Sequence, residues 1–194
     1  MDNFIKALNN LMIAEGGYVF NPKDPGGETY KGISKKYNKN WSGWQLIDPI
    51  VEYLSSRFFG KELQAKIDEQ LKTNIELIER VREFYYNNYW FKFSGDKLPY
   101  EVAEEMLEQS VLLGTWKTAG KNLQKALNLL NRNGKLFDDL KVDGLIGRKS
   151  LEAVGKIKPK RLVKVLNGIQ FCRLKKAMEE NPEKEIFVGW FDRI

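Results

Sequence analysis

The sequence predicts a mainly α protein with one small β element. Apolar residues recur at three- and four-residue steps through most of the 194 residues, which is the pattern of helices with one buried face. One stretch, residues 18–33, is instead rich in glycine and proline. Hydrophobic residues form 42% of the chain, so a sizeable core is expected.

The first expected helix begins near Phe4, where apolar residues start to recur at helical spacing. Gly16 and Gly17 follow the periodic segment, and a glycine just past the last periodic residue commonly ends a helix. Glu15 is therefore expected at the helix C-terminus, directly before a loop.

Residues 18–33 are the least helical stretch of the chain. Two short β-prone fragments, Tyr18–Phe20 and Thr29–Lys31, flank the turn sequence Pro-Lys-Asp-Pro-Gly-Gly. This pattern predicts a small hairpin or an ordered loop. Ordered loops on a helical scaffold often carry catalytic groups.

Helical periodicity returns from about Pro49 to Trp90, where two or three segments are expected. Further helices are expected from Pro99 to Leu113, from Thr118 to Leu130, from Arg148 to Val154 and from Pro159 to about Glu179. A boundary near residues 95–99 divides the chain into regions 1–95 and 96–194, which we expect to pack as one compact unit. The turn at residues 141–147 is expected to be structural.

The composition narrows the chemistry that the chain can perform. There is no histidine, which excludes Ser-His-Asp and Cys-His catalysis in their usual forms and histidine-ligated zinc. The single cysteine, Cys172, allows neither an internal disulfide nor a thiolate cluster, and its apolar neighbours predict a small buried side chain. We therefore expect no metal or cofactor, and carboxylates are the leading candidates for acid–base chemistry.

The chain has a formal net charge of +6, from 32 basic and 26 acidic residues. Such a surplus favours polyanionic surroundings such as nucleic acid, an anionic membrane or a cell wall, although a merely basic surface is the simpler interpretation. No nucleic-acid motif accompanies the charge, so no nucleic-acid partner is expected. No apolar run approaches the ~18 residues of a membrane span, and the first residues lack the pattern of a secretory signal.

Glu15 and Asp24 form the carboxylate pair that stands out. A tight loop can bring them onto one cleft, because Asp24 lies in the loop that follows Glu15. The negative end of the helix dipole disfavours an ionised Glu15, as a general acid requires. Asp24, in a polar turn, is expected to activate water or to stabilise an oxocarbenium-like transition state, with Thr29 holding the water. Alternatively, Glu15 is only a solvated helix end and Asp24 only supports a turn.

Several motifs resemble one known family. Residues 15–18, Glu-Gly-Gly-Tyr, and residues 21–34, Asn-Pro-Lys-Asp-Pro-Gly-Gly-Glu-Thr-Tyr-Lys-Gly-Ile-Ser, resemble the signature of glycoside hydrolase family 108. Members of this family include phage endolysins and proteins labelled secretion activators. Later segments resemble the same family in the same order, namely residues 86–90, 123–128, 142–147 and 189–193.

The resemblance implies a lysozyme-like helical fold, with a catalytic region at 1–95 and a predicted peptidoglycan-binding region at 96–194. It implies an N-acetylmuramidase that cleaves the β-1,4 bond between N-acetylmuramic acid and N-acetylglucosamine, in cell lysis or in wall remodelling for secretion. Glu15 matches the family's catalytic glutamate, and Asp24 and Thr29 fall on recurring positions of its loop. The chain departs from the family at Glu108 and Leu112, where many members carry Asp and a later Asn.

Aromatic residues are candidates for contacts with sugar rings. We expect substrate contacts from Tyr18 and Tyr30 near the loop and from Tyr86, Tyr89 and Trp90 in the later aromatic run. Aromatic residues at helical spacing more often belong to a core, which is the competing interpretation.

Two other functions compete with the muramidase. A lytic transglycosylase acting on the same bond would need only the glutamate, and a non-catalytic cell-wall-binding secretion helper would use the fold as a scaffold. The expected partners are peptidoglycan glycan strands, with no stable membrane insertion. Because no signal peptide is expected, synthesis in the cytoplasm and action in the periplasm or cell wall would require export through a holin or a secretion pore.

Overall fold

The computed structural model describes residues 2–20 and 27–193, and the chain divides into two compact units. The hairpin unit is Leu8–Tyr85, and the helical unit joins Met1–Ala7 to Tyr86–Ile194. The described residues form eight α-helices and a three-stranded sheet, so the predicted mainly α class is confirmed. The boundary placed near residue 95 stays a prediction.

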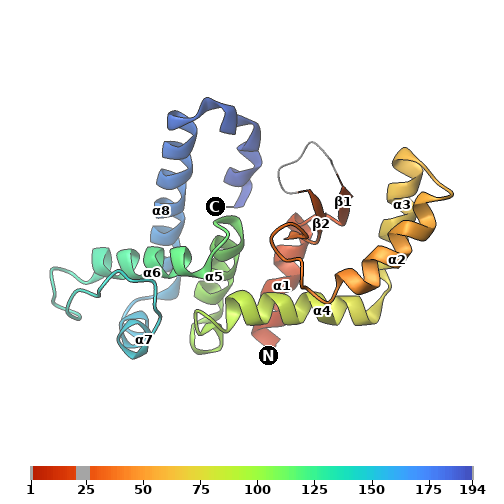
Figure 1. Ribbon diagram of the computed structural model, residues 1–194. Coiled ribbons are helices and arrows are strands. Elements are labelled where there is room, and N and C mark those ends of the chain that lie inside the picture. The colour runs from red at the N-terminus through yellow and green to blue at the C-terminus, as the bar shows by residue number, and fades with distance from the viewer. Residues whose placement is uncertain (1, 21–26, 194) are drawn as a thin grey trace. The chain divides into compact units, whose positions relative to one another are not determined.

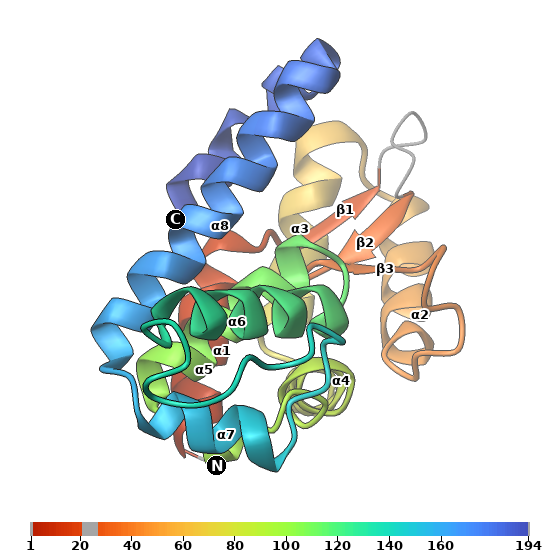
Figure 2. The same cartoon turned by 90° about the vertical axis from the view of Figure 1, so that its left-hand side faces the viewer.

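In the hairpin unit, the end of α1 (Asp2–Ala14) leads into a small antiparallel sheet. Its strands are β1 (Tyr18–Phe20), β2 (Glu28–Tyr30) and β3 (Ile33–Ser34), side by side in that order (Figure 2). Tyr18 pairs with Tyr30, and Tyr30 pairs in turn with Ile33. Both expected β fragments are confirmed to within one residue. The third strand was not expected, because two residues are too few to show alternation.

Three helices complete the hairpin unit, namely α2 (Trp44–Ser55), α3 (Gly60–Lys72) and α4 (Ile75–Tyr85). The expected helix start at Pro49 was wrong, because α2 already begins at Trp44 and contains Pro49 in its interior. Proline removes one intrahelical hydrogen bond, but the buried side chains of Trp44 and Ile47 hold the first turns of α2 against the core.

After α4, the chain enters the helical unit with a π-helical turn, Tyr86–Trp90, and a 3-10 turn, Gly95–Lys97. Its helices are α5 (Tyr100–Leu112), α6 (Trp116–Leu130), α7 (Arg148–Gly155) and α8 (Pro159–Glu180), with a 3-10 segment at Pro182–Arg193. The helices α5, α6 and α8 pack against one another around a shared core, and α7 packs against α6 (Figure 1).

Buried polar side chains form a network in the core between α5, α6 and α8. Glu105 is only 8% exposed and accepts a hydrogen bond of 2.8 Å from the Gln109 amide. Gln109 accepts in turn from Asn122 of α6 at 2.9 Å. When the Asn167 amide of α8 is oriented to donate, its nitrogen lies 2.9 and 3.0 Å from the two Glu105 oxygens. The carboxylate therefore has hydrogen-bond donors from both α5 and α8.

The pKa of Glu105 is raised to about 7, chiefly by burial; the hydrogen bond from Gln109 lowers it, and the charges of Glu108 and Glu104 contribute to the rise. Gln170 of α8 is fully buried in the same unit, and neither of its amide atoms has a hydrogen-bond partner among the described residues.

The turn at residues 141–147 and the side chain of Cys172 both lie in the helical unit. In the 141–147 turn, Asp143 Oδ1 accepts from Gln124 at 3.0 Å and from the Leu145 N–H at 2.9 Å, and whether the turn is only structural stays a prediction. The expectation that Cys172 is buried was wrong, since its side chain is exposed. The buried residues of α8 recur every four positions, at Leu162, Leu166, Gln170 and Leu174, and position 172 lies on the other side of the helix.

No helix within residues 2–20 and 27–193 has the length and apolar character needed to cross a bilayer. The same residues contain no group of three or more cysteine and acidic side chains arranged to hold a metal ion.

Candidate active site

Glu15 follows directly after α1, and its backbone N–H still donates to the Leu11 carbonyl at 3.2 Å. Its side chain is half-buried. The carboxylate lies against the Cα of Gly32, because a Cβ built on Gly32 would be only 2.6 Å from Glu15 Oε2. Any side chain at position 32 would therefore require the carboxylate to shift.

The Tyr85 hydroxyl borders the same point. It would lie 2.8 Å from a Cβ on Gly32, and it donates a hydrogen bond of 2.7 Å to the Lys31 carbonyl. Lys31 and Gly32 form the two-residue turn between β2 and β3, with φ of 48° and 76°. Positive φ at both turn residues matches the right-handed twist of the strands that they join. The end of α1, the end of α4 and this turn thus converge around one carboxylate.

A second glycine, Gly17, fixes the chain on the other side of Glu15. A Cβ on Gly17 would overlap the Asp68 carboxylate of α3. Asp68 Oδ1 accepts from the Tyr18 backbone N–H at 2.8 Å, and Gln64 donates both to Asp68 Oδ2, at 3.0 Å, and to the Tyr18 carbonyl. The segment that carries Glu15 is therefore held at both ends, by α1 and by α3.

Tyr18 and Tyr30, two of the expected substrate contacts, are both buried. Tyr18 donates to Glu28 Oε1 at 3.1 Å, and burial together with the Glu28 charge raises the pKa of Tyr18 well above its usual range. Tyr30 donates to the Leu71 carbonyl at 3.5 Å, and burial, with a smaller contribution from Asp68, raises its pKa to about 12. Both rings pack in the hairpin unit, and their contact with sugar stays a prediction.

The other two expected catalytic residues are Asp24 and Thr29. Asp24 lies outside the described residues, so its convergence with Glu15 stays a prediction. Thr29 lies in the middle of β2, paired with Val19 and Ser34, and its side chain is half-buried. Alternation along the strand places it on the opposite face from Tyr30, which is buried.

The later aromatic run lies in the helical unit. Trp90 is fully buried, packs its ring 5.4 Å from that of Phe4, and donates to Asp96 Oδ1 at 2.9 Å. Tyr86 donates to Asp96 Oδ2, also at 2.9 Å. Tyr86 and Tyr89 are half-buried, so both keep some surface exposed to solvent.

The two positions that depart from the family pattern lie one turn apart on α5. Glu108 and Leu112 are both half-buried, and residues four apart share a helix face. This face of α5 therefore carries one acidic and one apolar side chain at the two positions.

Sequence reasoning singled out Glu15 but not the groups that position it. Gly32 lies inside the motif that resembles the family, but the sequence assigns it no role. No sequence pattern indicates that Asp68 and Gln64 contact the segment that carries Glu15. Tyr85 begins the aromatic run, where nothing distinguishes it from its neighbours. The one local feature that indicates close packing of another group against the backbone is a glycine in a two-residue hairpin turn.

A half-buried glutamate held beside a hairpin on a helical scaffold, in a chain without histidine, points to the class of lysozyme-like glycoside hydrolases. Comparison with known proteins agrees. The sequence model of the family described as glycosyl hydrolase 108 matches residues 8–114, and the chain belongs to this family. A second model, described as a predicted peptidoglycan domain, matches residues 118–194.

Among solved structures, the chain is similar to Brucella abortus SagA, with 29% sequence identity and a TM-score of 0.63. The match covers 98% of this chain and 88% of the SagA chain. No curated protein sequence matches the chain. The protein is therefore a lysozyme-like glycoside hydrolase that acts on peptidoglycan.

Proposed function

We propose that this protein is an N-acetylmuramidase that hydrolyses the β-1,4 bond between N-acetylmuramic acid and N-acetylglucosamine, with Glu15 as the general acid. The observation that supports this proposal most is the position of the Glu15 carboxylate, which lies against Gly32 beside the Tyr85 hydroxyl. All three residues fall within the segment matched by the hydrolase family.

In this proposal, Glu15 gives its proton to the glycosidic oxygen as the bond from that oxygen to the anomeric carbon breaks. Asp24 accepts a proton from a water molecule, which Thr29 helps to hold, and the water oxygen bonds to the anomeric carbon. The two carboxyl groups exchange protonation states, and each cleaved bond consumes one water molecule. Tyr86 and Tyr89, which the sequence suggests as sugar contacts, both keep some surface exposed.

The test compares the wild type with Glu15→Gln in clearing a suspension of purified peptidoglycan. We expect Glu15→Gln to reduce the rate by roughly 10²–10⁴-fold, because a positioned acid contributes about that much. The matched control is Glu105→Gln, which makes the same change at a glutamate buried in the helical unit, and it should stay within a few-fold of wild type. A Glu15→Gln variant that clears peptidoglycan at the wild-type rate would overturn the proposal.

Lytic transglycosylation is the second candidate, because that reaction needs one acid and Glu15 alone could provide it. Mass spectrometry of the released fragments separates the two reactions. A muramidase gives reducing N-acetylmuramic acid ends, whereas a transglycosylase gives 1,6-anhydro ends. If wild type and Glu15→Gln both bind peptidoglycan and neither cleaves it, the protein is instead a wall-binding secretion helper.

We further propose that the enzyme is made in the cytoplasm and reaches the wall through a holin or a secretion pore, for lysis or for local remodelling during secretion. Co-expression with a holin tests this directly. Lysis should require both the holin and an intact Glu15, and lysis without the holin would indicate another export route.

A further inference from the structure

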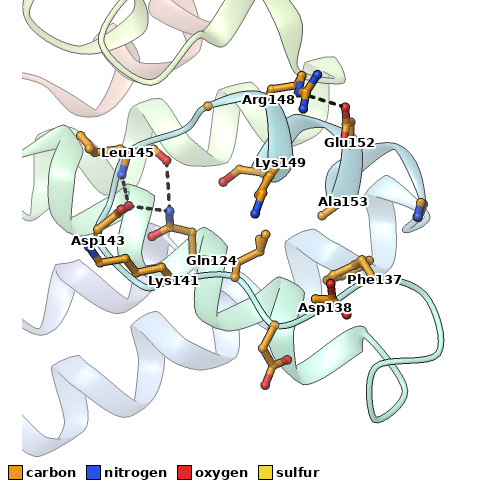
Figure 3. A pocket seen from close by; sticks show the side chains of 15 residues that line it. Gln124, Phe137, Asp138, Lys141, Asp143, Leu145, Arg148, Lys149, Glu152 and Ala153 are labelled. Carbon is orange, nitrogen blue, oxygen red and sulfur yellow. Dashed lines mark hydrogen bonds and ion pairs between the residues drawn. The ribbon is translucent and has the colours of Figure 1, made fainter.

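The helical unit contains a pocket of about 770 Å³, distant in sequence from Glu15. It lies between α7 and the loop at 137–145, and Gln124 of α6 also lines it (Figure 3). Its volume falls within the ~300–1,000 Å³ of small-ligand sites. The pocket is therefore large enough for a short peptide or a similar group.

One wall of the pocket is the N-terminus of α7. The N-cap residue, Gly147, has no side chain to cap the helix, and the first turn contains no acidic residue. In any helix the first backbone N–H groups lack an intrahelical acceptor, and here they belong to residues 148–150, which all line the pocket. Such a terminus attracts an anion.

Two side chains at this terminus point to a ligand independently of the helix. Ser150 lines the pocket and is only 4% exposed, yet its hydroxyl has no hydrogen-bond partner among the described residues. The oxygen itself still reaches the solvent of the pocket, so a ligand atom can take the place of water beside it. Lys149 extends from α7 into the pocket (Figure 3) and forms no ion pair within the described residues, whereas Arg148 pairs with Glu152 at 3.6 Å.

The side chains that line the pocket carry charges of both signs, so the pocket does not suit a simple polyanion. Four basic and four acidic side chains line it, namely Lys141, Arg148, Lys149 and Lys156 with Asp138, Asp139, Asp143 and Glu152. Asp138 lies on the loop across from α7 and has no ion-pair partner among the described residues (Figure 3). A ligand that carries both a carboxylate and an ammonium group fits this pattern better than a chain of phosphates does.

We propose that this pocket binds the peptide stem of peptidoglycan, with a stem carboxylate at the N-terminus of α7 and the ammonium group of the stem's diamino acid facing Asp138. Lys149 and Ser150 bind the carboxylate together with the free backbone N–H groups. The inference rests on the proposed function, because the stem belongs to the same polymer, and it adds recognition of peptide to cleavage of glycan.

The test measures binding of N-acetylmuramyl-L-alanyl-γ-D-glutamyl-meso-diaminopimelyl-D-alanine to the full chain by calorimetry. This probe has a single sugar and hence no bond for the enzyme to cleave. Lys149→Gln and Ser150→Ala should weaken binding at least five-fold. Lys160→Gln is the matched control, since Lys160 is exposed on α8 and does not line the pocket, and it should bind as wild type.

The sharpest variant is Gly147→Asp. A Cβ fits there freely, with no atom within 4 Å, and an aspartate at the N-cap would accept hydrogen bonds from the same N–H groups that await the ligand. We expect its melting temperature to equal or exceed that of wild type while probe binding falls at least ten-fold. A loss of folding cannot produce that combination.

The proposal is overturned if wild type does not bind the probe at millimolar concentration, or if Gly147→Asp and Lys149→Gln bind it as wild type does. It is equally overturned if oligomeric glycerol phosphate or an N-acetylglucosamine oligomer displaces the probe. Its failure is distinct from failure of the muramidase, because Glu15→Gln should bind the probe normally. An inactive enzyme with normal probe binding would refute the proposed catalysis and retain this pocket.

Discussion

In the hairpin unit, Glu15 lies half-buried against a bare glycine, next to a tyrosine hydroxyl, at the junction of a helix and a hairpin. In the helical unit, Glu105 lies deep between three helices, surrounded by amides that donate to it. Both are glutamates near helical segments, but Glu15 keeps part of its surface exposed, whereas Glu105 is buried.

The difference bears on how a candidate for the proposed catalytic acid is chosen. A raised pKa alone would select Glu105, since burial raises its pKa to about 7. The position of Glu15 is what favours it as the proposed acid, because the glycine at 32 has no side chain that would occupy the space beside its carboxylate. The raised pKa of Glu105 thus reflects its burial rather than a catalytic role.

The largest expected effect concerns Gly32. In Gly32→Ala, the new methyl group would collide with Glu15 Oε2 and the Tyr85 hydroxyl, so the acid must move. We expect peptidoglycan hydrolysis to fall by about 100-fold, which is typical of a displaced catalytic group. Gly60→Ala is the control, since Gly60 also has positive φ, 56°, but has no atom near its Cβ position. It should lower the melting temperature without changing the rate, and full activity of Gly32→Ala would break the comparison.

The second prediction concerns the stability of Glu105→Gln as a function of pH. The native state raises the pKa of Glu105 from 4.5 to about 7, so it favours the protonated form. The stabilisation of wild type relative to Glu105→Gln is therefore complete below pH 4.5 and is lost as the pH rises towards 7. The change is on the order of 3 kcal/mol at most.

Urea unfolding of wild type and Glu105→Gln between pH 4 and pH 8 measures this difference. Glutamine can replace the carboxylate because the Asn167 amide can turn to accept instead of donating. A free-energy difference that is constant across this pH range would mean that the Glu105 carboxylate titrates normally.

A smaller effect is expected at Gly17. The methyl group of Gly17→Ala would overlap the Asp68 carboxylate and separate β1 from α3, so we expect a loss of about 1–3 kcal/mol in unfolding free energy. Gly16→Ala provides a neighbouring control, because nothing lies within 4 Å of its Cβ position, and it should stay within about 0.5 kcal/mol of wild type. Equal stability of the two variants would show that the Asp68 contact does not anchor the strand.

The smallest effect is expected for Tyr85→Phe, which removes the hydrogen bond to the Lys31 carbonyl. The expected cost is about 1 kcal/mol in thermal unfolding. Tyr53→Phe should change nothing, since Tyr53 is exposed and its hydroxyl donates to no described residue. If the rate of hydrolysis falls far more in Tyr85→Phe than its stability implies, the hydroxyl also acts on Glu15 directly.

The parts of the fold that depend on local sequence could be predicted. Helical periodicity located the later helices, and the turn residues located the hairpin, because propensity and spacing act within a few residues. Contacts between distant segments could not be predicted in this way. The Asp68 carboxylate reaches Tyr18 from α3, and the Tyr85 hydroxyl reaches Lys31 from α4.

Side-chain orientation was the other source of error. The apolar neighbours of Cys172 suggested burial, but the four-residue repeat of α8 turns this position outward. The pocket beside α7 had no sequence signature, because backbone N–H groups and a common serine form its binding wall. Glu15 was accessible to sequence reasoning because its motif is contiguous.

The packing of α5 has a consequence for how such proteins can be recombined. The hydrolase match ends at residue 114 and the peptidoglycan-domain match begins at 118, so that border separates α5 from α6 and α8. These three helices share one core, with Glu105 and Gln109 on one side of the border and Asn122 on the other. In a chimera joined at this border, α5 would have to pack against the α6 and α8 of another protein, whose apolar side chains do not match it. The border between the two family matches therefore does not coincide with either boundary of the hairpin unit, Leu8–Tyr85.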